Sequence, residues 1–367
     1  MIDPRMERLA GVLVKHSLRL RTGDLFIIRS GPSAAPLVKA VYSQAIKAGA
    51  HTHVHLGLDD LPEIFYKNAS PRQLRYVSPL SLYEIKNATA QLSIISEENT
   101  KALTHVDPKK MATVSHANQR ITRIFLERAA KQQLRWCITQ YPTNAAAQDA
   151  DMSLDEYEAF LFDAAHVTAK QPLRYWNSMY TKQEKIKHVL ESKKTFHITA
   201  KDTDLKLTTT GRKWINCYGR ENFPDGEVFT GPIETSADGH IRYSFPISYG
   251  GREVHDVALT FSKGKVVKAD ASQGEEFLKA MIAMDPGAQR LGEFSFGTND
   301  GITRYTKNTL FDEKIGGTMH LALGSGYPET GSTNKSGLHW DMVCDLRKDG
   351  QVIADGDLIF KNGRFLH

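Results

Sequence analysis

A change of pattern near Lys194 constrains the fold of this chain more than any other feature. Before it, short apolar runs alternate with segments of helical character. The apolar runs are expected strands at residues 23–30, 51–58, 88–96 and 134–143. Strands that alternate with helices predict a parallel sheet with helices on both faces. After Lys194, short strands follow one another closely, and one clear helix at 274–285 interrupts them.

The pattern therefore predicts an α/β chain, with an N-terminal parallel-sheet α/β domain and a β-rich α+β C-terminal domain. A length of 367 residues suggests two domains, or three. The boundary is placed within the helix expected at roughly 181–193, which gives domains of residues 1–185 and 186–367. The second domain is expected to hold an antiparallel or mixed sheet, with a partly closed barrel as one form.

Composition excludes several classes of protein. Hydrophobic residues make up 41% of the chain and charged residues 24%, so the chain can bury a core and is not disordered. The net charge of +5 is scattered, which argues against nucleic-acid binding. Three distant cysteines favour a reducing cytoplasm. No signal peptide or membrane-spanning run is recognised, and no G-x-G-x-x-G motif supports dinucleotide binding.

Acidic and histidine side chains concentrate between Glu293 and Asp341. His339 and Asp341 flank a tryptophan, so on a strand they project from the same face. His320 lies in the run MHLALG, which predicts a buried strand. Buried carboxylates and imidazoles are costly unless they are paired or bind metal. Nitrogen and oxygen ligands without cysteine favour Zn, Mn, Co or Mg, and indicate a two-metal hydrolase more than a structural zinc site.

Other candidates have plain structural interpretations beside the functional one. Glu227 in DGEVFTGP lies in an exposed turn or at a strand end, and Glu313 in TLFDE is a loop charge or a further ligand. Glu293 is expected to share a strand face with Leu291 and Ser295, which faces either solvent or a site. Tyr327 lies in a glycine-flanked loop, where a phenol either projects toward a site or simply packs within the loop.

Histidines also alternate along the second expected strand, at His51, His53 and His55. They share one strand face, yet the expected strand itself contains no carboxylate. We therefore expect a polar, exposed strand face there and no metal site.

The motifs of the second half together resemble one family. GEVFTGP, RLGEFSFGTN, NTLFDE, HLALGSGYPET and GLHWDMV occur in the order, and at close to the spacing, of the thermophilic-type metallo-aminopeptidases, the aminopeptidase T family. The resemblance covers most of residues 180–341 and is weaker in the N-terminal half. It implies a metal-dependent aminopeptidase that removes N-terminal residues from peptides with a water activated by two divalent ions (Zn, Co, Mn or Mg). It also implies a homodimer.

The resemblance also assigns roles to residues. The implied metal ligands are Glu227, Glu293, Glu313, His320, His339 and Asp341. Glu293 would bridge the two ions and take part in catalysis, and Tyr327 would be the catalytic tyrosine. Other possibilities are a different two-metal amidohydrolase or esterase, a non-catalytic protein of the same fold that binds a peptide or metabolite, and a structural mononuclear site.

Overall fold

The computed structural model describes residues 3–249 and 252–366, and the chain divides into two compact units. The first unit ends at Leu173 and also takes in Gly219–Phe223. The second unit comprises Arg174–Tyr218 and the chain from Pro224 onward. The units therefore change at the start of helix α9 (Pro172–Glu191), whereas the boundary expected between residues 185 and 186 lies inside that helix.

The first unit contains a parallel five-stranded sheet in the order β2-β1-β3-β4-β8, which confirms the predicted fold class. Its strands are β1 (Leu25–Ser30), β2 (His51–Leu56), β3 (Ala90–Ile95), β4 (Arg135–Gln140) and β8 (Asn222–Phe223). The first four coincide with the expected strands. The short strand β8 was not expected, because two residues carry no periodic signal.

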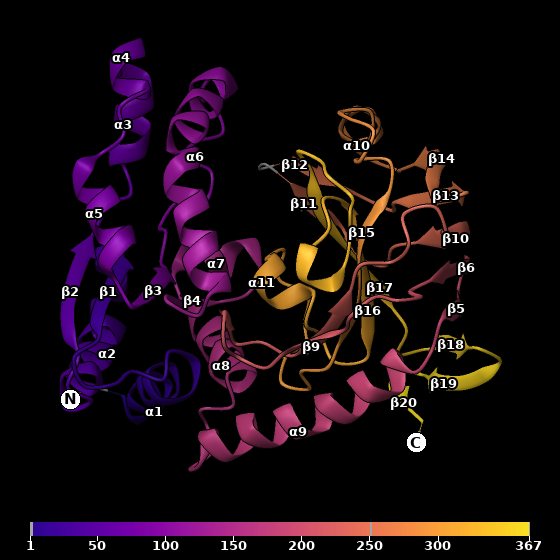
Figure 1. Cartoon of the computed structure of the whole chain (residues 1–367), viewed down its shortest axis with the longest axis horizontal. Coiled ribbons are helices and arrows are strands. Elements are labelled where there is room, and N and C mark those ends of the chain that lie inside the picture. The colour runs from indigo at the N-terminus through magenta and orange to yellow at the C-terminus, as the bar shows by residue number, and fades with distance from the viewer. Residues whose placement is uncertain (1–2, 250–251, 367) are drawn as a thin grey trace. The chain divides into compact units, whose positions relative to one another are not determined.

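Helices follow the strands of this sheet, as the alternation predicted (Figure 1). They are α1 (Pro4–Val12), α2 (Ala35–Lys47), α3 (Leu61–Asn68), α4 (Pro71–Leu74), α5 (Pro79–Asn87), α6 (Pro108–Ala130), α7 (Asn144–Asp149) and α8 (Leu154–Ala164). Asp107 caps α6 by accepting a hydrogen bond from the Lys109 backbone N–H, and Ser153 and Glu156 form the capping box of α8.

Apolar side chains of β1 are buried on both faces of the sheet. Ile27 packs in a cluster with Ile85 of α5 and Phe125 of α6. Phe26 and Ile28 point to the opposite face and are fully buried as well. The sheet is therefore covered on both faces at β1. The edge strand β2 differs, because its three histidines are exposed, as the sequence predicted.

The second unit is built from two antiparallel sheets and a hairpin. The sequence predicted an antiparallel or mixed sheet, with a partly closed barrel as one form. One sheet has eight strands in the order β14-β13-β10-β6-β5-β18-β19-β20, and the other has five in the order β17-β16-β15-β9-β7. The strands of the first sheet are β5 (Thr195–Ala200), β6 (Thr203–Thr208), β10 (Asp238–Arg242), β13 (Ala258–Ser262), β14 (Lys265–Asp270), β18 (Gln351–Ala354), β19 (Asp357–Lys361) and β20 (Arg364–Phe365). Those of the second are β7 (Ile215–Cys217), β9 (Glu227–Thr230), β15 (Leu291–Gly297), β16 (Thr318–Gly324) and β17 (His339–Asp345). The hairpin pairs β11 (Ile247–Tyr249) with β12 (Arg252–Val254).

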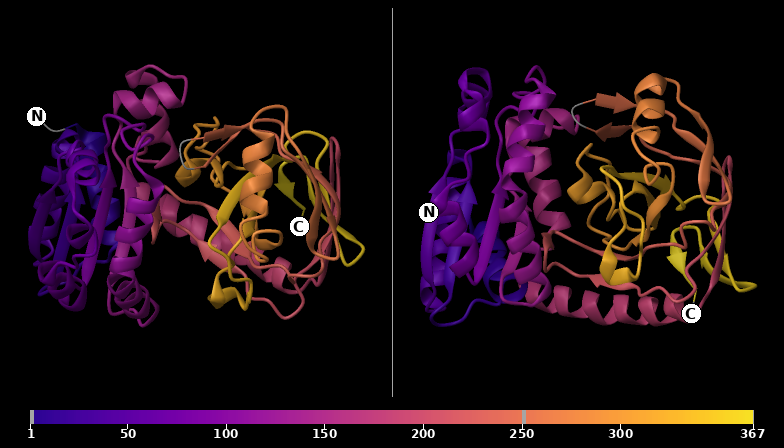
Figure 2. Two further views of the ribbon diagram at one scale, coloured as in Figure 1. Left: turned by 90° about the horizontal axis from the view of Figure 1, so that it is seen from above. Right: turned by 45° about the horizontal axis from the view of Figure 1, so that its top comes forward.

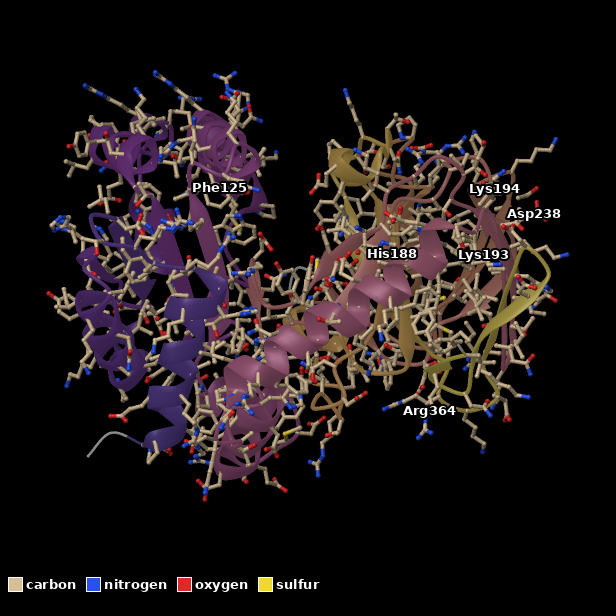
Figure 3. All side chains as sticks on the ribbon, turned by 60° about the horizontal axis from the view of Figure 1, so that its bottom comes forward. Phe125, His188, Lys193, Lys194, Asp238 and Arg364 are labelled. Carbon is tan, nitrogen blue, oxygen red and sulfur yellow. The ribbon has the colours of Figure 1, made fainter. Side chains whose placement is uncertain are left out.

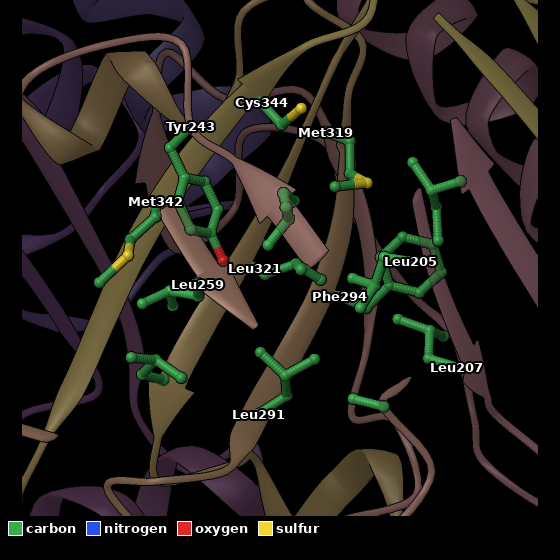
Figure 4. Packing of buried hydrophobic residues seen from close by; sticks show 14 of the residues in the cluster. Leu205, Leu207, Tyr243, Leu259, Leu291, Phe294, Met319, Leu321, Met342 and Cys344 are labelled. Carbon is green, nitrogen blue, oxygen red and sulfur yellow. The ribbon is translucent and has the colours of Figure 1, made fainter. Parts of the chain in front are cut away.

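One apolar core joins the two sheets of the second unit. It includes Leu205 and Leu259 from the eight-stranded sheet and Phe294, Leu321 and Met342 from the five-stranded sheet (Figure 4). The inward faces of both sheets thus share a single hydrophobic layer. The opposite face of β15–β17 is free to carry polar groups, because strand side chains alternate.

Two helices lie beside the sheets of the second unit (Figure 2), and both add apolar side chains to this core. Helix α9 contributes Ile186 and Leu190, and helix α10 (Glu275–Ile282) contributes Leu278. The outer side of α9 is polar: His188 is exposed, and Lys193 just beyond the helix forms an ion pair with an aspartate of β19 (Figure 3). Among the described residues, no helix is both long and apolar enough to span a membrane.

A β-bulge corrects one expectation about β15. Leu291 was expected on the same face as Glu293, but it packs in the apolar core with Phe294 (Figure 4). The register between β15 and β16 shifts between Leu291 and Glu293, so strict alternation fails there. A Cβ at Gly292 would lie 2.4 Å from the carbonyl oxygens of Gly324 and Ser325, so the bulge requires glycine.

We expect Phe294→Ala to lower the free energy of unfolding by about 3–5 kcal/mol, the usual cost of truncating a buried phenylalanine. Phe294 is fully buried, and its ring lies 5.4 Å from that of Phe196 and 5.5 Å from that of Trp214. Chemical denaturation of both proteins measures the change. Val267→Ala on the exposed face of β14 is the control, expected within about 0.5 kcal/mol of wild type. Equal losses in the two variants would contradict this packing.

Candidate metal centre

The polar face of the five-stranded sheet gathers five of the predicted ligands. Glu227 begins β9, Glu293 lies on β15, His320 on β16, and His339 and Asp341 on β17. The strand register places Glu293 opposite Ala322, which in turn lies opposite Asp341. A small alanine therefore separates the two carboxylates, and space remains between them.

Three overlapping groups of ligand atoms lie on this face. They are Glu227–Glu293–His320, Glu293–His339–Asp341 and Glu313–His320–Asp341, and within each group all the ligand atoms lie within 4.8 Å of one another. His320 Nε2 lies 3.3 Å from Glu293 Oε1, and His339 Nε2 lies 3.5 Å from Glu293 Oε2. Glu293 thus directs one oxygen toward each histidine, which is the arrangement that a bridging carboxylate requires.

Both histidines present Nε2 to this cluster because Nδ1 is held elsewhere. Nδ1 of His320 lies 3.0 Å from the backbone carbonyl of Glu313, and Nδ1 of His339 lies 2.8 Å from that of Ser325. A neutral imidazole that donates from Nδ1 to a carbonyl leaves the Nε2 lone pair free for a metal. The backbone therefore selects the ring nitrogen that faces the carboxylates.

Glu313 enters the cluster from the end of the short helix α11 (Thr309–Asp312). The interpretation as an exposed loop charge is wrong, because only 14% of its side chain is exposed. The next residue, Lys314, is fully buried, forms an ion pair with Glu313, and has its Nζ 3.4 Å from Glu227 Oε1.

Tyr327 follows the glycine-rich end of β16 and precedes a 3-10 turn, Pro328–Thr330. Its ring centroid lies 5.1 Å from that of Phe229 and 5.3 Å, edge-on, from that of His339. Partial burial, followed by the negative charge of Glu293 and Asp341, raises the pKa of Tyr327 above its ordinary value. The phenol therefore keeps its proton and can donate a hydrogen bond beside the ligand cluster.

The pKa values of the cluster indicate that its carboxylates strongly stabilise a positive charge placed among them. Burial alone would lower the pKa of His320 and His339, yet the neighbouring carboxylates raise them to about 9 and about 12. Burial raises the pKa of Asp341, but His339 outweighs it and brings the value to about 2. Burial raises the pKa of Glu313 to about 8 despite Lys314. Divalent cations supply positive charge to the same carboxylates when they bind.

One buried oxygen shows independently that the residues fit a metal. Asp341 Oδ1 is buried and accepts no hydrogen bond from any described residue, and the nearest histidine nitrogen, His339 Nε2, lies 3.4 Å away. A buried carboxylate oxygen without a donor is costly. Asp341 belongs to two of the three ligand groups, so a cation bound there would satisfy this oxygen.

Sequence reasoning missed the supporting residues of the cluster. Ser295 donates a hydrogen bond of 3.0 Å to Glu227 Oε2, and Gln183 of α9 donates to the Glu227 backbone carbonyl at 2.7 Å. Ser295 was predicted to share a face with Glu293, but its partner was not foreseen. Lys314 has no sequence signal of this kind, because a lysine beside two acidic residues ordinarily indicates an exposed loop.

The fold and the site together define a metallopeptidase. The chain matches the family described as thermophilic metalloprotease (M29) over residues 2–365, and it belongs to that family. It is 26% identical to aminopeptidase 2 of Geobacillus stearothermophilus over 408 aligned residues, which cover 99% of this chain and 98% of that relative. It is 27% identical to aminopeptidase T of Thermus thermophilus over 360 residues, with 90% of this chain and 87% of that relative covered.

Solved structures agree with this assignment. The structure of wild-type AmpT from Thermus thermophilus superposes with a TM-score of 0.86 at 25% identity and covers 99% of both chains. The 2,5-dihydroxypyridine dioxygenase of Pseudomonas putida shares the fold, with a TM-score of 0.60 at 14% identity, 100% of this chain and 98% of that chain being covered. The family and the relatives confirm the resemblance and the prediction of a metal-dependent aminopeptidase, a hydrolase.

Proposed function

We propose that this aminopeptidase removes N-terminal residues from peptides with two divalent ions held on the polar face of β9, β15, β16 and β17. The observation that carries the proposal is the overlap of the three ligand groups, in which Glu293 belongs to two groups and no ligand atom is more than 4.8 Å from the others of its group. The proposed ligands are Glu227, Glu293, Glu313, His320, His339 and Asp341.

When bound, a pair of such ions supplies a water of lowered pKa and polarises a carbonyl group. Residues of the chain transfer the proton, stabilise the developing negative charge and bind the substrate amine. A carboxylate of the cluster, Glu293 or a neighbour, accepts a proton from the attacking water and passes it toward the leaving amine. The Tyr327 hydroxyl donates a hydrogen bond to the oxygen on which negative charge develops. An acidic side chain of the cluster pairs with the free α-ammonium of the substrate, which accounts for cleavage at the N-terminus.

We further propose that the protein is a cytoplasmic homodimer. Exposed apolar side chains gather on α2 and the adjacent β2: Tyr42 and Ile46 on α2, and Val54 and Leu56 on β2. A strand at the edge of a sheet, exposed on both faces and apolar in part, is ordinarily covered by a partner. Sedimentation of the full chain tests the dimer. The reducing compartment is supported by the small number of cysteines, Cys137, Cys217 and Cys344, which lie far apart in the sequence.

Removal of metal is expected to abolish turnover. The full chain treated with a chelator should lose at least about 99% of its activity on an aminoacyl-anilide, and Zn, Co, Mn or Mg should restore it, because the ions supply the attacking water. An N-acetylated anilide, which lacks the free amine, and a simple ester are matched control substrates. Equal cleavage of the acetylated substrate would contradict the aminopeptidase and favour another amidohydrolase or esterase. Full activity after complete metal removal would contradict the metal centre itself.

A further inference from the structure

Lys314 is the feature of this site that the proposed function leaves unexplained. Its side chain is fully buried among acidic residues, and its ammonium pairs with both Glu227 and Glu313. The backbone fixes it there: the Lys314 N–H donates to the Phe311 carbonyl at 2.9 Å, and its carbonyl accepts from the Asn299 N–H at 3.1 Å. The backbone at Lys314 is therefore held on both sides, and its side chain is 0% exposed.

The two carboxylates that Lys314 holds belong to different ligand groups. Glu227 is part of the group with Glu293 and His320, and Glu313 is part of the group with His320 and Asp341. Every group that uses His320 therefore includes a carboxylate paired with the ammonium. The group Glu293–His339–Asp341 contains no such carboxylate, and both oxygens of Glu293 face histidines.

We propose that the buried ammonium of Lys314 makes the two metal positions unequal in their affinity for ions. An ion binds tightly at Glu293, His339 and Asp341, while an ion at the His320 position competes with the ammonium for Glu227 and Glu313 and binds more weakly. The inference rests on the proposed two-ion function and adds to it the order in which the two positions bind their ions. Two physical effects act together: shared carboxylate oxygens donate less to an ion, and a fixed positive charge within a few ångströms repels it.

Zinc titration of the full chain tests this directly. Metal-free protein is titrated with Zn²⁺ against a chelator of known affinity, and retained zinc is counted after dialysis. The wild-type chain is expected to bind one zinc ion at least about tenfold more tightly than the second. In Lys314→Met the weaker step should tighten at least about tenfold, while the tighter step changes by less than about threefold.

The matched control is Lys182→Met, which removes a lysine of the same unit whose ion pair with Asp300 is exposed. Both zinc affinities should stay unchanged in it. Circular dichroism verifies folding, and Lys314→Gln replaces the methionine variant if that variant does not fold. The stepwise affinities of the wild-type chain are a test that needs no variant.

The possible results separate this inference from the proposed function. Two equal zinc affinities in the wild-type chain, or unchanged affinities in a folded Lys314 variant, overturn the role of Lys314 and leave the two-ion aminopeptidase standing. A wild-type chain that retains no zinc, cobalt or manganese overturns the metal centre and the inference with it. Unequal sites that become similar in Lys314→Met support the inference.

Discussion

Replacing Glu293 with glutamine is expected to abolish peptide hydrolysis and to reduce metal content. Glu293 is 4% exposed, and its two oxygens face His320 and His339, so one substitution affects two ligand groups. Loss of a residue that only orients a metal ligand costs about 10–100-fold. Loss of a shared ligand that also takes part in catalysis should lower kcat/KM at least about a thousandfold.

Two measurements on the Glu293→Gln variant test this expectation. Turnover of an aminoacyl-anilide gives kcat/KM, and elemental analysis after dialysis gives ions per chain. Glu276→Gln on the exposed surface of α10 makes the same chemical change away from the site and should leave both values as in wild type. Wild-type turnover and metal content in Glu293→Gln would remove this carboxylate from the centre.

Tyr327→Phe is expected to lower kcat about 10²–10³-fold while metal content stays unchanged, because one donor to the developing oxyanion is lost. The phenol lies beside the proposed ligand His339, with the two ring centroids 5.3 Å apart. Phenylalanine keeps the ring packing against Phe229 and His339, so the variant isolates the hydroxyl.

The Tyr327 variant calls for kcat, KM and metal content to be measured together. Tyr180→Phe is the control, since that tyrosine is 42% exposed and its ring lies 4.7 Å from that of Tyr218. An unchanged kcat would exclude a role for the Tyr327 hydroxyl in the reaction. A fall in metal content equal to the fall in activity would instead indicate that the hydroxyl supports the ligands.

Patterns within a few residues of one another predicted much of this structure. The four long strands of the N-terminal sheet and the strands that carry His320 and His339 were recognisable because hydrophobic periodicity is local. The same-face placement of His339 and Asp341 also follows directly from strand geometry. The expected boundary at residues 185 and 186 stays a prediction.

Long-range contacts decided what local patterns did not reveal. Leu291 turned toward the core because Gly292 meets the chain at Gly324 and Ser325, and that approach is invisible in the segment itself. The two-residue strand β8 exists because it pairs with β4, more than eighty positions earlier. Neither feature has a sequence signal that a window of neighbouring residues could contain.

The sequence alone determined the class of this protein: its motifs contain the ligand types of a metal-dependent aminopeptidase on strands of the right character. Tertiary structure alone decided how those ligands meet, with Glu293 between two histidines and Glu313 turned inward. It alone revealed Lys314 as a buried cation among them. The physical reason is that burial and charge pairing depend on distances between separate strands, and chain order does not specify those distances.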